Sequence, residues 1–437
     1  MILTHPEHAG RRIRLGYGLN LRECASVDEL LELLSDVAAP VRQRLGLPGS
    51  LGVGLYAPAA LARRLADPAG ADELERLARE IEALGLDPFT WNAFPFGGFG
   101  AAGLKARVFE PDWSAGERLA FTLDVARVAT ALAVSLDGAA GARGRHVSLS
   151  THTGGFGPAL SGARELEVAA FQLARCVDGL ASLEEATGVR VVLALEPEPG
   201  ANAATQRALD QLLAFVRPRA RSLLEAERNR APERAAALVE RHLGACLDAC
   251  HAAVEGEAAE VAADLSAGRR AGPAKYQHSS ALRVPSPAAN PHALEALLAL
   301  AEPRFLHQVR GHGAGELLAV DDLPDLAREL AGPRRAAWLR AASWSCHFHV
   351  PVDLAAAGAA LETTRDEAEA LLAALAREPA GWSTPELHVE IETYTWEALP
   401  GWVRGTDPLV EGIERELRRV LAVLERQGWR APDLAGR

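Results

Sequence analysis

Short runs of apolar residues alternate along the chain with longer segments in which apolar residues recur every three or four positions. The short runs are rich in β-branched and aromatic residues and are bounded by turn residues, which is typical of buried strands; the longer spacing is typical of amphipathic helices. Strands that alternate with helices in this way favour parallel βαβ units. The ten candidate strands lie at residues 13–20, 51–57, 88–95, 145–153, 189–199, 243–251, 274–282, 304–310, 343–352 and 386–394.

The segments between these strands carry helix signals. Residues 26–46 begin with Ser26 as an N-cap, and Glu29 three residues later completes a capping box. Apolar stripes of helical period also occur at 71–85, 114–134 and 408–424.

Repeated βα alternation over 437 residues predicts an α/β protein with a (β/α)8 TIM barrel, which needs eight strands and tolerates long insertions. The alternative, an open doubly wound sheet, lacks the glycine-rich phosphate-binding motif that would follow a strand. We therefore expect one barrel domain over residues 1–437, with the candidate strands at 304–310 and 343–352 inside an insertion at about 283–385, between strands seven and eight. A second insertion at about 94–113, after strand three, is expected to cover the barrel mouth.

The composition narrows the class of protein. With 49% hydrophobic and 24% charged residues, the chain is typical of soluble globular proteins. Its formal net charge of -12 argues against nucleic acid as a partner. The five cysteines fit a reducing compartment, and the apolar stretches fall short of the roughly 20 residues that span a bilayer. We expect a cytoplasmic protein without membrane insertion.

Three of the predicted strands end in acidic side chains. Burying an unpaired carboxylate costs several kcal/mol, and a barrel brings the carboxyl ends of its strands to one face. Three such strands therefore suggest a shared divalent cation, for which Mg²⁺, Mn²⁺ and Zn²⁺ all remain open. The residues are Glu196 and Glu198 in VVLALEPEP, Asp248 with His251 three residues later in GACLDACH, and Glu390 and Glu392 in LHVEIETYTW.

Other residues allow alternative sites. Cys246 and Cys250 could form a thiolate zinc site, but a lone C-x-x-x-C is a weak signal and buried cysteines behave as small apolar residues. His347 and His349 are two positions apart, so on a strand they share one face and could hold a metal or a substrate oxygen. His307 stands alone, and a lone histidine on an apolar strand is also typical of a hydrogen-bonded core residue.

The motifs LALEPEP, CLDACH, KYQHSSAL, FLHQV, HFHVPV and HVEIETYTWEALP, in this order, resemble the EboE family of metabolite-traffic proteins from bacterial Ebo clusters. More broadly, they resemble the xylose-isomerase-like TIM barrels, which include sugar isomerases, sugar epimerases and endonuclease IV-type enzymes. The resemblance runs from the first strand to the last helix. It implies one or more divalent ions (Mn, Mg or Zn) in the barrel mouth, with Glu196, Asp248 and Glu392 as ligands and His251 beside them.

The resemblance also implies a fourth ligand, usually a histidine on strand seven, where this chain has Gln277. A glutamine carbonyl binds a hard cation more weakly than an imidazole does, so catalysis could be altered or lost. His278 has the opposite parity and would reach the interior only through a bulge. Lys275 shares the face of Gln277 and would contact an anionic substrate or pair with Glu196.

Three functions remain open. The first is an EboE-like protein that handles or modifies a small metabolite for export, with other Ebo-cluster proteins as partners. The second is a metal-assisted sugar isomerase or epimerase in which Glu198 or Glu390 is the base. The third is an endonuclease IV-like phosphodiesterase, against which the acidic charge argues. The candidate catalytic residues are Glu198, His251, Lys275 and Glu390, and the candidate substrate-binding residues are Asn92, His307, His347 and His349.

Overall fold

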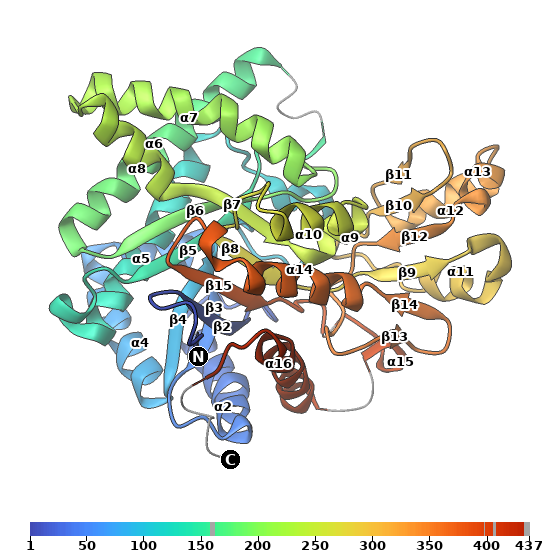
Figure 1. Ribbon diagram of the computed structural model, residues 1–437, viewed down its shortest axis with the longest axis horizontal. Coiled ribbons are helices and arrows are strands. Elements are labelled where there is room, and N and C mark those ends of the chain that lie inside the picture. Colours follow the sequence, from blue (N-terminus) through green and yellow to red (C-terminus); the bar gives the residue numbers. More distant parts are fainter. Residues whose placement is uncertain (158–161, 397, 405–407, 432–437) are drawn as a thin grey trace.

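The computed structural model describes residues 1–157, 162–396, 398–404 and 408–431. Eight parallel strands form a closed barrel, in which β2 pairs with both β15 and β3 and so completes the ring (Figure 1). The (β/α)8 fold predicted from the sequence is confirmed. The barrel strands are β2 (Arg12–Gly18), β3 (Leu51–Tyr56), β4 (Leu86–Asn92), β5 (His146–His152), β6 (Arg190–Glu196), β7 (Leu243–Asp248), β8 (Lys275–His278) and β15 (Glu386–Ile391), and β1 (Ile2–Thr4) pairs antiparallel with β2.

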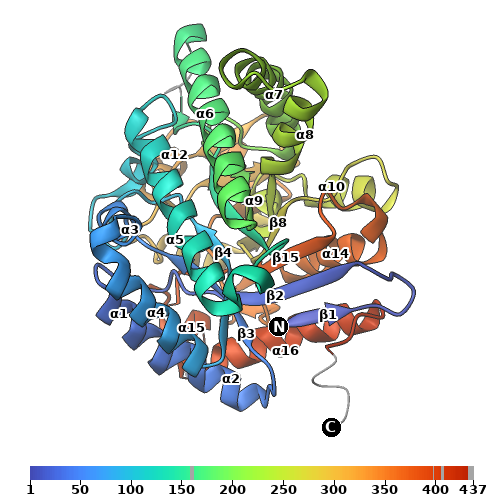
Figure 2. The ribbon, with the colours of Figure 1, turned by 90° about the vertical axis from the view of Figure 1, so that its left-hand side faces the viewer.

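Helices fill the connections and surround the barrel (Figure 2). The predicted cap at Ser26 is present, because its Oγ accepts a hydrogen bond from the backbone N of Glu29 at 3.2 Å. The helices around the barrel are α1 (Val27–Leu33), α2 (Ala39–Leu45), α3 (Ala59–Ala66), α4 (Ala71–Ala83), α5 (Gly116–Gly141), α6 (Ala163–Thr187), α7 (Gln206–Arg228), α8 (Pro232–His242), α9 (Ala249–Val254), α10 (Ala258–Ser266), α14 (Arg365–Arg377) and α16 (Leu409–Arg426).

Helix α5 is long and apolar enough to cross a membrane by length and composition, which corrects the expectation that every apolar stretch is too short. It packs instead as part of the barrel, against α3, α4 and α6. Half of its apolar window is buried in the molecule. Its buried Arg118 also binds the main chain of the loop between β4 and α5, donating to the carbonyl oxygens of Phe94 at 2.6 Å and Pro111 at 2.8 Å.

A second, antiparallel sheet lies beside the barrel mouth, between β8 and β15 in the chain (Figure 1). Its strands follow the order β11-β10-β12-β9-β14-β13. The sheet has its own hydrophobic core, which includes Trp338 and Trp344. The elements of this region are β9 (Leu282–Pro285), α11 (Pro291–Leu298), β10 (Val309–His312), β11 (Leu318–Val320), α12 (Leu323–Ala331), α13 (Arg335–Arg340), β12 (Ser343–Cys346), β13 (Ala356–Ala357) and β14 (Leu361–Thr363), with α15 (Gly401–Arg404) next to β13.

The boundaries of this insertion differ from the predicted ones. The segment 283–385 includes α14, which returns to the barrel and packs against α10 and α16. The apolar run 274–282 is split, because β8 ends at His278 and β9 begins at Leu282. The run 343–352 is a strand only as far as Cys346, since the chain turns away from the second sheet toward the barrel mouth.

The barrel interior is polar. Ser148, Lys275, His388 and Glu390 are all buried there, and Lys275 Nζ lies 2.6 Å from Glu390 Oε2. A Cβ at Gly54 would lie 1.6 Å from Glu390 Oε1, so only glycine leaves room for this carboxylate. Charged and hydroxyl side chains therefore pair with one another inside the barrel, as Ser148 also does with His388.

Candidate metal centre

Three carboxylates meet where strands β6, β7 and β15 end. Glu196 closes β6, Asp248 closes β7, and Glu392 follows β15. One carboxylate oxygen from each residue lies within 4.8 Å of the other two. None of the three residues is more than 5% exposed. The structure therefore brings together the three acidic residues that the sequence predicts as metal ligands.

This arrangement is electrostatically unfavourable without a cation. Burial, together with the charges of Glu392 and Asp248, raises the pKa of Glu196 well above its ordinary value. Burial and the neighbouring acids Glu390 and Asp248 raise the pKa of Glu392 to about 8. Among the described residues, Glu196 Oε2 has no hydrogen-bond partner. The three carboxylates are a set that can hold a divalent metal ion, whose charge would offset their repulsion.

Polar neighbours hold these carboxylates in place. Asn20 Nδ2 donates a hydrogen bond to Glu392 Oε1 at 2.8 Å, and Ser279 Oγ donates to Asp248 Oδ2 at 2.8 Å. Asp248 Oδ1 also accepts from the backbone N of His251 at 2.7 Å, as the N-cap of α9. Asn20 and Ser279 were not predicted. Their one signal in the sequence is that each lies just after a barrel strand.

Gln277 joins this cluster through its amide nitrogen. Its Nε2 donates to Glu392 Oε2 at 2.9 Å, while its Oε1 accepts from Cys246 Sγ at 2.9 Å. The carbonyl oxygen thus faces a thiol, and Gln277 supports Glu392 in this arrangement rather than offering a fourth oxygen ligand. His278 does not bulge inward, because its Nδ1 lies 3.1 Å from the hydroxyl of Tyr276, which in turn donates to the main chain of α14.

The two cysteines of the C-x-x-x-C pattern contact different partners and form no thiolate pair. Cys246 donates to Gln277, as above, and Cys250 Sγ donates to the carbonyl oxygen of Phe348 at 3.5 Å. Burial raises the pKa of both thiols well above the ordinary value. These thiols therefore stay protonated and act as small hydrogen-bond donors.

Five of the predicted site residues do not line the pocket in the described part of the chain: Asp248 and Gln277, described above, and Lys275, Glu390 and His307. Lys275 pairs with Glu390 rather than with Glu196. Burial lowers the pKa of Lys275 and the Glu390 charge raises it, with a net value of about 12, so the ammonium group of Lys275 is charged. His307 is buried, and its Nε2 lies 3.3 Å from Glu302 Oε1. Lys275, Glu390 and His307 are therefore held by internal partners.

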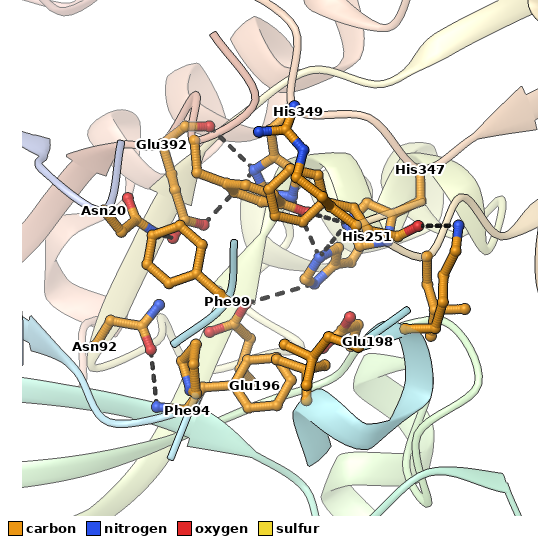
Figure 3. Close-up of a pocket in the computed structure, with 18 residues that line it drawn as sticks. Asn20, Asn92, Phe94, Phe99, Glu196, Glu198, His251, His347, His349 and Glu392 are labelled. Carbon is orange, nitrogen blue, oxygen red and sulfur yellow. Dashed lines mark hydrogen bonds and ion pairs between the residues drawn. The ribbon is translucent and has the colours of Figure 1, made fainter. Parts of the chain in front are cut away.

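A pocket opens over the carboxylates, and the loop 94–113 forms part of its wall (Figure 3). Asn92 also lines it, with its Oδ1 accepting from the backbone N of Phe94 at 2.9 Å. Lys105 and Arg304 lie at its edge, but each is engaged by an acid, Lys105 by Asp322 at 2.7 Å. The apolar and aromatic wall residues are Phe94, Pro95, Phe99, Leu104, Val108, Phe305, Leu306 and Tyr394.

One more acid and three histidines complete the pocket floor: Glu198, His251, His347 and His349. Burial, with the charges of Asp248 and Glu392, raises the pKa of Glu198 well above its ordinary value. Burial lowers the pKa of all three histidines, to about 4 for His349. His347 and His349 lie beyond the end of β12, so the segment after the strand, and not a strand face, directs them into the pocket.

Comparison with known proteins adds little to this geometry. No family model and no curated protein matches the chain. One similar solved structure is that of the IolI protein with a zinc atom, with a TM-score of 0.41 and 13% identity over 95% of this chain and 99% of that one. Another is the probable 3-DHS dehydratase AsbF of petrobactin synthesis from Bacillus anthracis, with a TM-score of 0.34 and 12% identity over 72% of this chain and 89% of that one. At these scores the likenesses carry no argument about activity, and the resemblance to EboE stays a prediction.

Proposed function

We propose that this protein is a metal-dependent enzyme of the isomerase or epimerase type, which moves a proton at a carbon next to a carbonyl group of a small metabolite. The convergence of Glu196, Asp248 and Glu392 within 4.8 Å carries the proposal, and two of the three, Glu196 and Glu392, line the pocket. Their oxygens suit a hard or borderline cation such as Mg²⁺, Mn²⁺ or Zn²⁺. Such an ion polarises substrate oxygens and stabilises the negative charge that develops on them.

Glu198 is the best placed base. It lines the pocket, and among the described residues no hydrogen bond to its carboxylate is found. Burial and the charges of Asp248 and Glu392 raise its pKa, so its carboxylate is a stronger base than that of an exposed glutamate. Glu390, the other candidate from the sequence, is held by Lys275 at 2.6 Å inside the barrel and does not line the pocket.

The second candidate function is an EboE-like protein that holds a metabolite for export without converting it. Two observations favour it. The amide of Gln277 faces Glu392 with a donor, at the place where the superfamily usually has an imidazole ligand. The pocket wall is also largely apolar and aromatic, which suits a hydrophobic metabolite better than a free sugar.

Solvent deuterium exchange separates the two candidates. The metal-loaded protein would be incubated in deuterated water with a panel of aldoses, ketoses, polyols and aromatic hydroxyketones, and deuterium incorporation followed by NMR. We expect incorporation at one carbon of at least one compound, lost in Glu198→Gln with metal content unchanged. The control is Glu316→Gln, an exposed acid that does not line the pocket, which should behave as wild type. Binding of a compound without exchange by wild type would support the carrier and contradict the enzyme.

A further inference from the structure

Glu416 is a fully buried acid of α16 that lies outside the pocket lining in the described part of the chain. Burying a carboxylate costs several kcal/mol unless hydrogen bonds or a charge compensate for the lost water. Hydrogen bonds reach both oxygens of this carboxylate. Its Oε1 accepts from the hydroxyl of Tyr17 at 2.9 Å and from Nε1 of Trp396 at 3.0 Å. Its Oε2 accepts from the hydroxyl of Thr393 at 2.7 Å and from the backbone N of Val352 at 3.0 Å.

Two of these donors lie in segments that also carry residues of the candidate site. Thr393 follows Glu392 directly, and Val352 lies three positions after His349. The two segments also contact each other, because Nδ1 of His349 lies 3.0 Å from the carbonyl oxygen of Glu392 (Figure 3). Glu416 thus fastens the segment after β15 and the segment after β12 to one helix of the barrel.

Helix α16 has room for the indole of Trp396. Gly412 lies one turn before Glu416, and a Cβ at Gly412 would lie 2.3 Å from Cη2 of Trp396. Only glycine allows this close approach. Trp396 is buried, and its Nε1 also donates to the hydroxyl oxygen of Tyr17 at 2.9 Å. The helix therefore holds the segment after β15 by an aromatic contact as well as by its carboxylate.

The two oxygens of Glu416 each face an N–H group that can only donate. Oε1 faces Nε1 of Trp396, and Oε2 faces the backbone N of Val352. A glutamine at this position would place its NH₂ group against one of these two N–H groups in either orientation of the amide. One of the two segments would then lose its hydrogen bond to α16. Only an ionised acid accepts from both segments at once.

We propose that Glu416 is a positioning residue for the metal site. It holds the segments of Glu392 and His349 in place from outside the pocket, and so sets the affinity of the carboxylate cluster for its ion. This inference rests on the metal ion of the proposed function, because Glu416 is itself no ligand. Loss of a residue that orients a metal ligand typically weakens metal binding by about 10- to 100-fold. Because Glu416 acts through the neighbouring Thr393, we expect an effect at the lower end of this range.

A competition titration of Mn²⁺ against a chromophoric chelator, on the full-length chain at about pH 8, tests the proposal. Burial raises the pKa of Glu416 to about 7, so the wild-type side chain is mostly ionised at this pH. Glu416→Gln should weaken metal binding about tenfold. The matched control is Glu386→Gln, because this buried acid lies at the other end of β15 and pairs with Arg14. The control should lower the melting temperature and leave the metal affinity unchanged.

Thr393→Val gives a second variant of nearly unchanged size, and it decides the question if Glu416→Gln does not fold. It removes one hydroxyl donor to Glu416 and should weaken metal binding by a smaller factor. The double variant should bind metal about as weakly as Glu416→Gln alone, because both changes break the same contact. Wild-type affinity in Glu416→Gln and Thr393→Val, or an equal loss in Glu386→Gln, would overturn the positioning role and leave the metal site standing. A wild-type protein that binds no metal would overturn this role together with the proposed function.

Discussion

Asn20 should set the affinity of the carboxylate site without being a ligand. Its Nδ2 donates to Glu392 Oε1 at 2.8 Å and so holds one ligand in place. A hydrogen bond to a charged group contributes about 1.5–3 kcal/mol. Asn20→Ala should therefore weaken metal binding roughly 10- to 150-fold, because 1.4 kcal/mol corresponds to a factor of ten. The measurement is a competition titration of Mn²⁺ or Zn²⁺ against a chromophoric chelator.

Asn92→Ala is the matched control, because Asn92 lines the same pocket but bonds the backbone N of Phe94 and no carboxylate. Its metal affinity should stay within about twofold of wild type, since removing it costs no contact to a ligand. Equal affinities in wild type and Asn20→Ala, or equal losses in both variants, would refute the role assigned to Asn20.

Two further predictions concern buried charges that the proposed reaction does not use. Lys275→Met should lower the free energy of unfolding by about 3–5 kcal/mol, because it leaves Glu390 buried and unpaired. Adding Glu390→Leu should restore most of this loss. Urea denaturation of both variants measures the two changes, and no recovery in the double variant would contradict the ion pair. Burial alone would raise the pKa of Glu386, but hydrogen bonding to His388 and the charge of Arg14 hold it below its ordinary value. The stability that Glu386 contributes is thus present above its unfolded pKa of about 4.3 and is lost as the pH falls. Glu386→Gln should therefore have a lower melting temperature at pH 7, and its melting temperature should fall less steeply than that of wild type as the pH is lowered. An equally steep fall in both proteins would count against this role of Glu386.

The sequence predicts most of the barrel, because each strand is a short buried run and each helix has a clear period. It also predicts the order of Glu196, Asp248 and Glu392, since acids that end buried strands must meet at one face of a barrel. The orientation of the Gln277 amide and the pairing of Lys275 with Glu390 cannot be predicted from the sequence. Both depend on contacts between the neighbouring strands β8 and β15 and the residue after β15, which lie more than 100 positions apart in the chain.

The positions of His347 and His349 also could not be predicted from the sequence. Their spacing in the sequence suggests a strand face, yet β12 ends at Cys346 and the chain then crosses to the barrel mouth. The Nδ1 atom of His347 lies 2.7 Å from Oε1 of Gln308, which precedes β10 and donates to the carbonyl oxygen of Pro199 after β6. No local pattern in FLHQV indicates that partner. The long insertion therefore completes the site in a way that only the folded chain reveals.

A crystal of the protein soaked with Mn²⁺, with the ion located by anomalous scattering, would show whether the three carboxylates bind a metal. Mn²⁺ favours carboxylate oxygens over nitrogen and sulfur ligands. We expect one anomalous peak within ligand distance of oxygens from Glu196, Asp248 and Glu392 together. A fully loaded crystal with no peak among these three residues, or with the three carboxylates turned apart, would contradict it.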